Sequence, residues 1–152
     1  MAMGGGIILT IFAVAIALVL AIRLAPSDPA VWHIAVADGS VATDGNCAEH
    51  IRVQTGGARA TCLLPGDPVQ VLTKLSAVAL AYPRTTLLAG SPAEGRMTWV
   101  SRSRIMGFPD YITAQAAQTP QGTRLDVYAR LRFGGSDLGV NAARLTTWLQ
   151  QM

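Results

Sequence analysis

The stretch MTWVSRSRIMGFPDYITAQAAQTPQGTRLDVYARLRFGGSDLGVN, residues 97–141, decides the fold expected for this chain of 152 residues. Strand-like runs in it are separated by short links rich in Gly and Pro, which is the pattern of successive β-hairpins. Short links favour antiparallel neighbours. Together with the run just upstream, the stretch therefore predicts a four-stranded antiparallel meander. The expected strands cover residues 84–89, 97–104, 111–118 and 124–133.

The last expected strand alternates most clearly, which predicts one apolar and one polar face. The apolar set is Leu125, Val127, Ala129, Leu131 and Phe133, and the polar set is Arg124, Asp126, Tyr128, Arg130 and Arg132. Two Arg-x-Arg pairs, Arg102/Arg104 and Arg130/Arg132, lie near the ends of two expected strands. One intervening strand would separate the pairs by about 9–10 Å. If their faces coincide, four guanidinium groups flank a strip that carries Thr113 and Gln115.

Two helices are expected to flank the sheet. Asp67 followed by Pro68 predicts a helix start, with Asp67 as the N-cap, and Pro83 ends that helix. A closing helix is expected to run from Asn141, its cap, to Gln151 and to bury Leu145, Trp148 and Leu149. The fold class is therefore α+β, with a meander between two helices in a single domain.

The first 24 residues predict a transmembrane anchor, because residues 7–22 are apolar apart from one threonine. At about 1.5 Å per residue, such a helix crosses a hydrocarbon core of about 30 Å. A cleaved signal peptide would have a basic start and a small-x-small cleavage site after the apolar run, and neither is found here. We therefore expect an uncleaved anchor, then a connector over residues 25–37 and one domain over residues 38–152.

The segment 38–66 shows little periodicity and is expected to be irregular. It contains Cys47 and Cys62, the chain's two cysteines. A disulfide between them is favoured over two free thiols, and both are favoured over a metal site with His50, whose spacing is loose. A disulfide requires an oxidising compartment, which for a bacterial protein is the periplasm. Arg23 alone, by the positive-inside rule, slightly favours a cytoplasmic domain instead.

The candidate ligand- or partner-binding residues surround the two Arg-x-Arg pairs. Guanidinium groups at this spacing suit an anionic headgroup, a phosphate or an acidic protein patch. The competing interpretation, which we favour, is that the arginines pair with Asp110, Asp126 and Asp137 and hold the turns against the sheet. The candidates are Arg102, Arg104, Asp110, Arg130, Arg132, Asp137 and Asn141.

The same residues carry a resemblance to a known family. The run WVSRSRIMGFPDYI and the run YARLRFGGSDLGVNAARLTTWL resemble the bacterial domain-of-unknown-function family fourteen-ninety-nine. Its pattern has an Arg-Ser-Arg strand, a Gly-Phe-Pro-Asp corner and a Ser-Asp-x-Gly-Val-Asn turn before a final helix that carries Arg144 here. Ala129 and Leu131 stand where the family usually has serines, and the cysteine-bearing loop departs from it as well. The resemblance implies a fold and no reaction.

Several classes of function are disfavoured by the composition. The chain has no Ser-His-Asp order, no phosphate-binding glycine loop and no Cys-x-x-Cys-His motif, so we expect no catalytic residues, metal or cofactor. Sparse aromatics and a net charge of only +3 disfavour nucleic-acid binding.

The chain is therefore expected to be a single-pass protein of the bacterial inner membrane with a periplasmic domain. Its expected role is a non-enzymatic binding or scaffold module, an accessory subunit of or partner to an integral membrane protein complex. The alternative is an envelope enzyme, or a protein that binds an anionic lipid or ligand on its arginine-rich sheet face.

Overall fold

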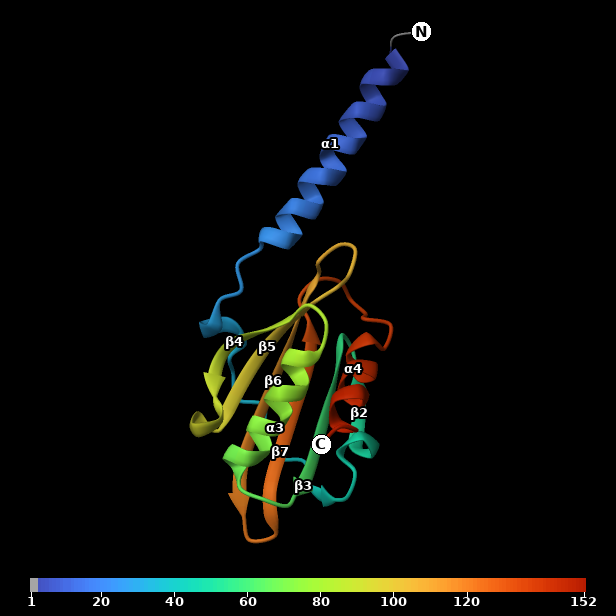
Figure 1. The fold of residues 1–152 in the computed structure, drawn as a ribbon. Helices are drawn as coiled ribbons and strands as arrows, with labels where there is room; N and C mark the ends of the chain where they lie inside the picture. The colour runs from blue at the N-terminus through green and yellow to red at the C-terminus, as the bar shows by residue number, and fades with distance from the viewer. Residues whose placement is uncertain (1–2) are drawn as a thin grey trace.

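The computed structural model describes residues 3–152 and shows a long helix attached to one end of an α+β domain (Figure 1). Helix α1 (Met3–Leu24) has 22 residues. Its segment Gly6–Leu24 has a mean hydropathy of 2.8 and only 6% of it is buried. By length and composition this segment suits a membrane span, and a signal sequence near an N-terminus has the same properties.

The meander expected from the sequence is present, but the expectation of a four-stranded sheet is wrong. The strand order is β1-β3-β7-β6-β5-β4, and β2 pairs with β3 beside this path. Strands β4 to β7 follow one another with antiparallel pairing, while β3 adds to the far side of β7. The strands are β1 (Thr43–Asp44), β2 (Ile51–Gln54), β3 (Gly57–Leu64), β4 (Thr85–Ser91), β5 (Arg96–Arg102), β6 (Pro109–Thr119) and β7 (Gly122–Leu131).

The extra strands come from the segment 38–66, so its expected irregularity is also wrong. Strand β3 pairs antiparallel with β7 along its whole length, from Gly57 opposite Arg130 to Leu64 opposite Thr123. Alternation does not reveal β3, because it is largely buried on both faces and is built from Gly, Ala, Arg, Thr, Cys and Leu. A Cβ on Gly57 would lie 2.2 Å from the carbonyl oxygen of Ala129. Only glycine therefore allows the two strands to approach there.

Helix α3 (Pro68–Ala81) begins as predicted, with the Asp67 side chain accepting from the backbone N–H groups of Val69 and Gln70. The closing helix α4 (Val140–Leu149) differs from the prediction at its start. Its N-cap is Gly139, at φ 82°, whereas Asn141 lies inside the first turn. The carboxylate of Asp137 accepts from the N–H groups of both residues, at 3.1 and 2.9 Å, and does the capping expected of Asn141.

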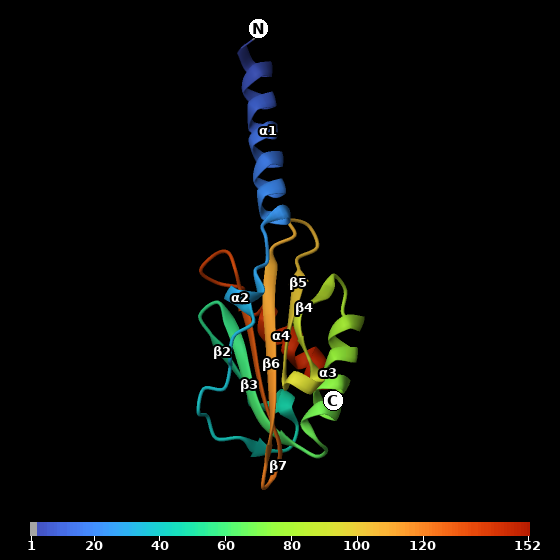
Figure 2. The same cartoon turned by 90° about the vertical axis from the view of Figure 1, so that its left-hand side faces the viewer.

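The hydrophobic core fills the space between the sheet and the two helices. Trp99 of β5 and Trp148 of α4 are fully buried and meet edge to face, with ring centroids 5.9 Å apart. From β7, Leu125, Val127 and Ala129 enter this core, as the alternation predicts. The opposite face of the sheet is covered by the connector that follows α1, including the short helix α2 (Pro29–Trp32). Figure 2 shows α2 and α3 on opposite sides of the sheet.

Candidate functional site

The polar back face of the sheet, turned away from α3 and α4, holds the connector in place. The Trp32 indole stacks on the Tyr111 ring of β6, with centroids 3.8 Å apart and planes 8° apart. The backbone carbonyl of Trp32 accepts hydrogen bonds from the Arg130 guanidinium and from the Thr113 hydroxyl. Side chains from two neighbouring strands thus bind the same residue of the connector.

A second pair of contacts fixes the connector nearer to α1. Arg132 donates to the carbonyl oxygen of Pro26 at 2.6 Å and to the Tyr111 hydroxyl at 3.1 Å. The Ser27 hydroxyl lies 2.8 Å from the same Tyr111 oxygen. We call these residues, with Trp32, Thr113 and Arg130, the connector clamp. Both arginines of the second Arg-x-Arg pair are therefore engaged with the chain's own backbone.

The clamp continues into a buried hydrogen-bond chain. Nδ1 of His33 lies 2.9 Å from the Thr98 hydroxyl, which lies 2.9 Å from the Thr113 hydroxyl, to which Arg130 donates at 3.3 Å. Burial lowers the pKa of His33, the positive charge of Arg96 lowers it further, and Glu94 partly opposes both. Burial likewise lowers the pKa of Arg130. Because Thr98, Thr113 and Arg130 are buried, the hydrogen bonds among them and to the half-buried His33 hold the connector in one position.

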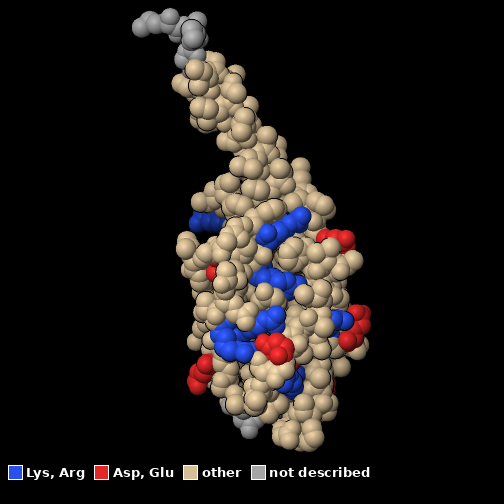
Figure 3. All heavy atoms as spheres, turned by 180° about the vertical axis from the view of Figure 1, so that it is seen from behind, with Lys and Arg blue, Asp and Glu red and all other residues tan. Residues whose placement is uncertain are grey.

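Arg102 and Arg130 lie on the strands that flank β6, as predicted, whereas Arg104 and Arg132 lie just beyond the ends of β5 and β7. The strip between the two pairs is not open. Thr113 bonds to Trp32, and Oε1 of Gln115 accepts from the backbone N–H of Val36 at 3.4 Å. The connector thus occupies the strip that the sequence suggested for a ligand. On this face, basic side chains recur from the base of α1 downward, with acidic side chains beside several of them (Figure 3).

The first Arg-x-Arg pair instead borders a pocket at the foot of α1. The pocket has a volume of about 380 Å³ and is lined by Arg23, Arg84, Arg102 and Arg104 together with Thr86, Ser103 and Gly107. None of the described residues that line it is acidic. Arg104 lies in the β5–β6 turn, outside the strand predicted for it, because β5 ends at Arg102. Arg23 and Arg84 were not among the candidate binding residues from the sequence, where Arg23 was considered only for membrane orientation and Arg84 only as the start of a strand.

Three of the four pocket arginines are held by backbone carbonyls. Arg23 donates to Ile105 at 2.7 Å, Arg84 to Arg102 at 3.1 Å, and Arg102 to Gly107 at 3.0 Å. A Cβ on Gly107 would come within 2.8 Å of Cγ of Arg23. Glycine at this position, with φ 74°, therefore lets the end of α1 pack on the β5–β6 turn.

The acidic candidates pair with other partners than expected. Asp110 accepts from Arg144 at 2.9 Å, and Arg144 also donates to the side-chain oxygen of Asn141. Burial raises the pKa of Asp110, and the Arg144 charge opposes this rise. Asp126 pairs with Arg124 at 2.7 Å, and Asp137 caps α4. The expectation that these acids tie down the Arg-x-Arg pairs is wrong for the described residues, where the ties run to backbone carbonyls.

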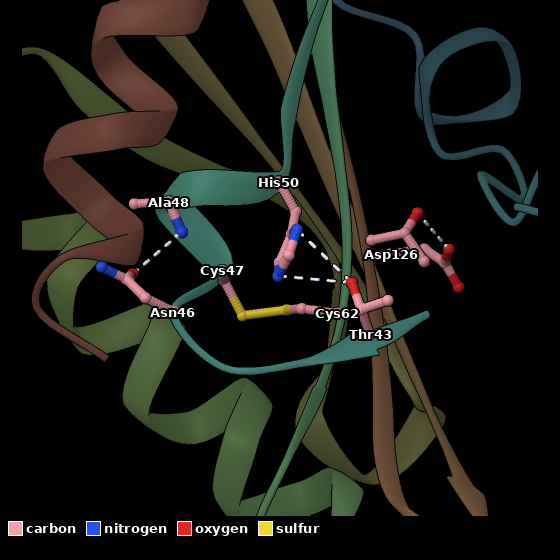
Figure 4. Close-up of a disulfide and its surroundings, with 8 residues drawn as sticks. Thr43, Asn46, Cys47, Ala48, His50, Cys62 and Asp126 are labelled. Atoms are coloured by element: carbon pink, nitrogen blue, oxygen red, sulfur yellow. Dashed lines mark hydrogen bonds between the residues drawn. A yellow bond between two sulfur atoms is a disulfide. The ribbon is translucent and has the colours of Figure 1, made fainter. Parts of the chain in front are cut away.

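The two cysteines form the favoured disulfide. Cys47, in the short helix η1 (Cys47–His50), is bonded to Cys62 of β3, with Cα atoms 5.4 Å apart (Figure 4). His50 points toward Thr43, whose hydroxyl lies 3.3 Å from Nε2. The disulfide fastens the segment before β2 to the sheet and leaves neither thiol available as a metal ligand.

A comparison with protein families matches residues 40–152 to the family described as "Protein of unknown function (DUF1499)". This match agrees with the resemblance drawn from the Arg-Ser-Arg and Ser-Asp-x-Gly-Val-Asn motifs. A search of curated proteins finds no match.

Proposed function

The chain belongs to the DUF1499 family, and we propose that it is a non-enzymatic binding module held rigidly at a bacterial inner membrane. In this proposal it serves as an accessory subunit of, or partner to, an integral membrane protein complex. The observation that carries the proposal is the connector clamp. A domain on a free tether would need no such contacts, whereas a module that must meet a membrane partner in one orientation benefits from them.

The clamp begins very close to the anchor. Helix α1 ends at Leu24, and the carbonyl of Pro26 already accepts from Arg132. Two residues of chain span at most about 7 Å. The end of the sheet next to α1 is thus held near the headgroup layer, so a partner that reaches this end of the domain is itself in or on the membrane.

The engagement of the titratable side chains supports binding rather than catalysis. His33 of the connector is bonded to Thr98 of β5, and Asp110 is paired with the largely buried Arg144. The disulfide supports a periplasmic domain, because such bonds persist in oxidising compartments.

The test is affinity purification of the tagged full-length protein from detergent-solubilised membranes, followed by mass spectrometry. We expect stoichiometric recovery of an integral membrane protein, confirmed by tagging that partner. A double variant with a broken clamp, Trp32→Ala/Arg130→Met, should recover less of it. Arg52→Met, which removes an exposed arginine, is the control and should recover as much as the wild type. Recovery of the protein alone, with and without chemical crosslinking, would reject the proposal.

A further inference from the structure

We infer that the pocket lined by Arg23, Arg84, Arg102 and Arg104 binds the phosphate group of an anionic membrane lipid. This site differs from the arginine strip expected from the sequence, since that strip is filled by the connector. It also goes beyond the protein partner proposed above, because a lipid can occupy the pocket whether or not such a partner exists.

The positive charge of the four pocket arginines is not compensated by ion pairs among the described residues. Among the described residues, the ion pairs involve Arg52, Arg59, Arg124 and Arg144 and none of the four pocket arginines. Four like charges around one hollow repel each other, and an anion placed among them removes that cost. A phosphate group fits because its oxygens accept the parallel N–H pairs of guanidinium groups.

Three of the pocket arginines are held in position before any ligand binds. The bonds from Arg23, Arg84 and Arg102 to backbone carbonyls use one side-chain nitrogen of each. A guanidinium carries five N–H donors, so each of these side chains is oriented and still has donors left. Arg104 makes no side-chain hydrogen bond within the described part of the chain and remains free to close on an anion. The pocket is thus arranged before the ligand arrives.

The position of the pocket at the end of α1 favours a lipid phosphate over a free phosphate ion. Arg23 is in the last turn of α1, directly after the apolar run, so the pocket sits where headgroup phosphates lie if α1 spans a bilayer. Exposed apolar side chains surround this end: Leu24 is 75% exposed and Ile105, in the β5–β6 turn, is 79% exposed. Such side chains are suited to the boundary between headgroups and acyl chains.

Two aromatic rings add to the exposed apolar surface at this end of the domain. Phe108 of the β5–β6 turn and Phe133 after β7 lie with ring centroids 6.2 Å apart, and both are partly exposed. Leu138, before α4, is 92% exposed. Figure 1 places the β5–β6 turn and the segment between β7 and α4 at the end of the domain that faces α1. A single surface therefore presents apolar residues and arginines toward the bilayer.

The test is native mass spectrometry of the purified full-length chain in detergent, titrated with phosphatidylglycerol, phosphatidylcholine or inorganic phosphate. We expect the wild type to retain phosphatidylglycerol in preference to phosphatidylcholine. Arg102→Met/Arg104→Met should lower the affinity for phosphatidylglycerol about tenfold or more, which is the scale of one or two charged hydrogen bonds. The control Arg52→Met/Lys74→Met removes the same charge from exposed positions elsewhere and should bind like the wild type.

The single variant Arg104→Met guards against a misfolded pocket, because Arg104 bonds to nothing that shapes the β5–β6 turn. It should still weaken phosphatidylglycerol binding several-fold with an unchanged melting temperature. Equal retention of both lipids, or equal losses in the pocket and control variants, would overturn the inference. Displacement of phosphatidylglycerol by millimolar inorganic phosphate would overturn the lipid source and assign the pocket to free phosphate. Only purified components are used, so a failed search for a protein partner leaves this result unaffected.

Discussion

The indole of Trp32 lies flat on the phenol ring of Tyr111, with ring centroids 3.8 Å apart, and so joins the connector that follows α1 to the middle of the sheet. Residues that far apart in sequence lose considerable chain entropy on meeting. The stacked rings and the hydrogen bonds around them offset that cost.

Trp32→Ala should release the connector. Stacked aromatic pairs contribute about 0.5–1.5 kcal/mol beyond the burial of their apolar area, so we expect a loss of about 1–3 kcal/mol in unfolding free energy. Hydrogen exchange of the full-length protein in detergent should become faster over residues 26–36. Trp32→Phe keeps an aromatic ring and should retain most of the protection. Equal protection in the alanine variant and the wild type would contradict the role given to this contact.

Arg130→Met should destabilise the protein, whereas Arg104→Met should not. Arg130 is buried and donates to Trp32 and Thr113, so its loss removes two hydrogen bonds from a charged donor at a cost of about 1–3 kcal/mol. Arg104 makes no side-chain bond in the described structure, and its loss should change stability by less than about 0.5 kcal/mol. Thermal unfolding of both variants measures the difference. Similar melting temperatures would show that the clamp does not depend on Arg130.

Acidification should weaken the connector through His33. Burial lowers the pKa of His33 below its ordinary value of 6.5, so the unfolded chain binds the proton more readily. The resulting stability is complete above pH 6.5 and declines as the pH falls toward the lowered folded pKa. Urea unfolding of the wild type and His33→Gln between pH 7.5 and 5 should show a steeper decline for the wild type. Parallel pH profiles would exclude His33 as the cause.

Arg144→Met should be among the most damaging substitutions. It leaves the carboxylate of Asp110 buried without a positive partner, for which about 3–5 kcal/mol is typical. Losing the Arg144 charge also raises the pKa of Asp110 further. A raised carboxyl pKa favours the folded state at low pH and loses that benefit as the pH rises through the folded pKa. The defect should therefore be smaller at pH 4 than at pH 7, and a pH-independent defect would argue against this cause.

Removing the disulfide by Cys47→Ala/Cys62→Ala should lower the unfolding free energy by about 3 kcal/mol, because the bridge closes a loop with a sequence separation of 15 residues. Equilibrium unfolding in denaturant measures the loss. A reducing agent should destabilise the wild type by a similar amount and leave the double variant unchanged. If it destabilised both equally, its effect would not come from this bridge.

The parts of the fold that were predicted depend on local signals. The alternation of β7 and the Asp67–Pro68 helix start each arise from a few adjacent residues, and both are confirmed. Strand β3 was missed because its pairing depends on Gly57 and alanines fitting against β7, which no local pattern expresses. The clamp was missed for a similar reason: Arg130 and Trp32 are 98 residues apart. The arginine pairs were recognised, but Arg102, Arg130 and Arg132 each donate to a backbone carbonyl, and such an acceptor has no sequence signature.

The two short strands beside β3 limit the ways in which another protein can bind to the sheet. Strand β1 pairs parallel with Cys62 and Leu63, and β2 covers Gly57 to Ala60, so together they cap the unpaired edge that β3 would otherwise offer. At the other end of the sheet, β4 is interrupted by a bulge between Leu87 and Ala89. Such interruptions discourage edge-to-edge aggregation and the addition of a foreign strand. We therefore expect a partner to bind through side-chain contacts and not by adding a strand to an edge of the sheet.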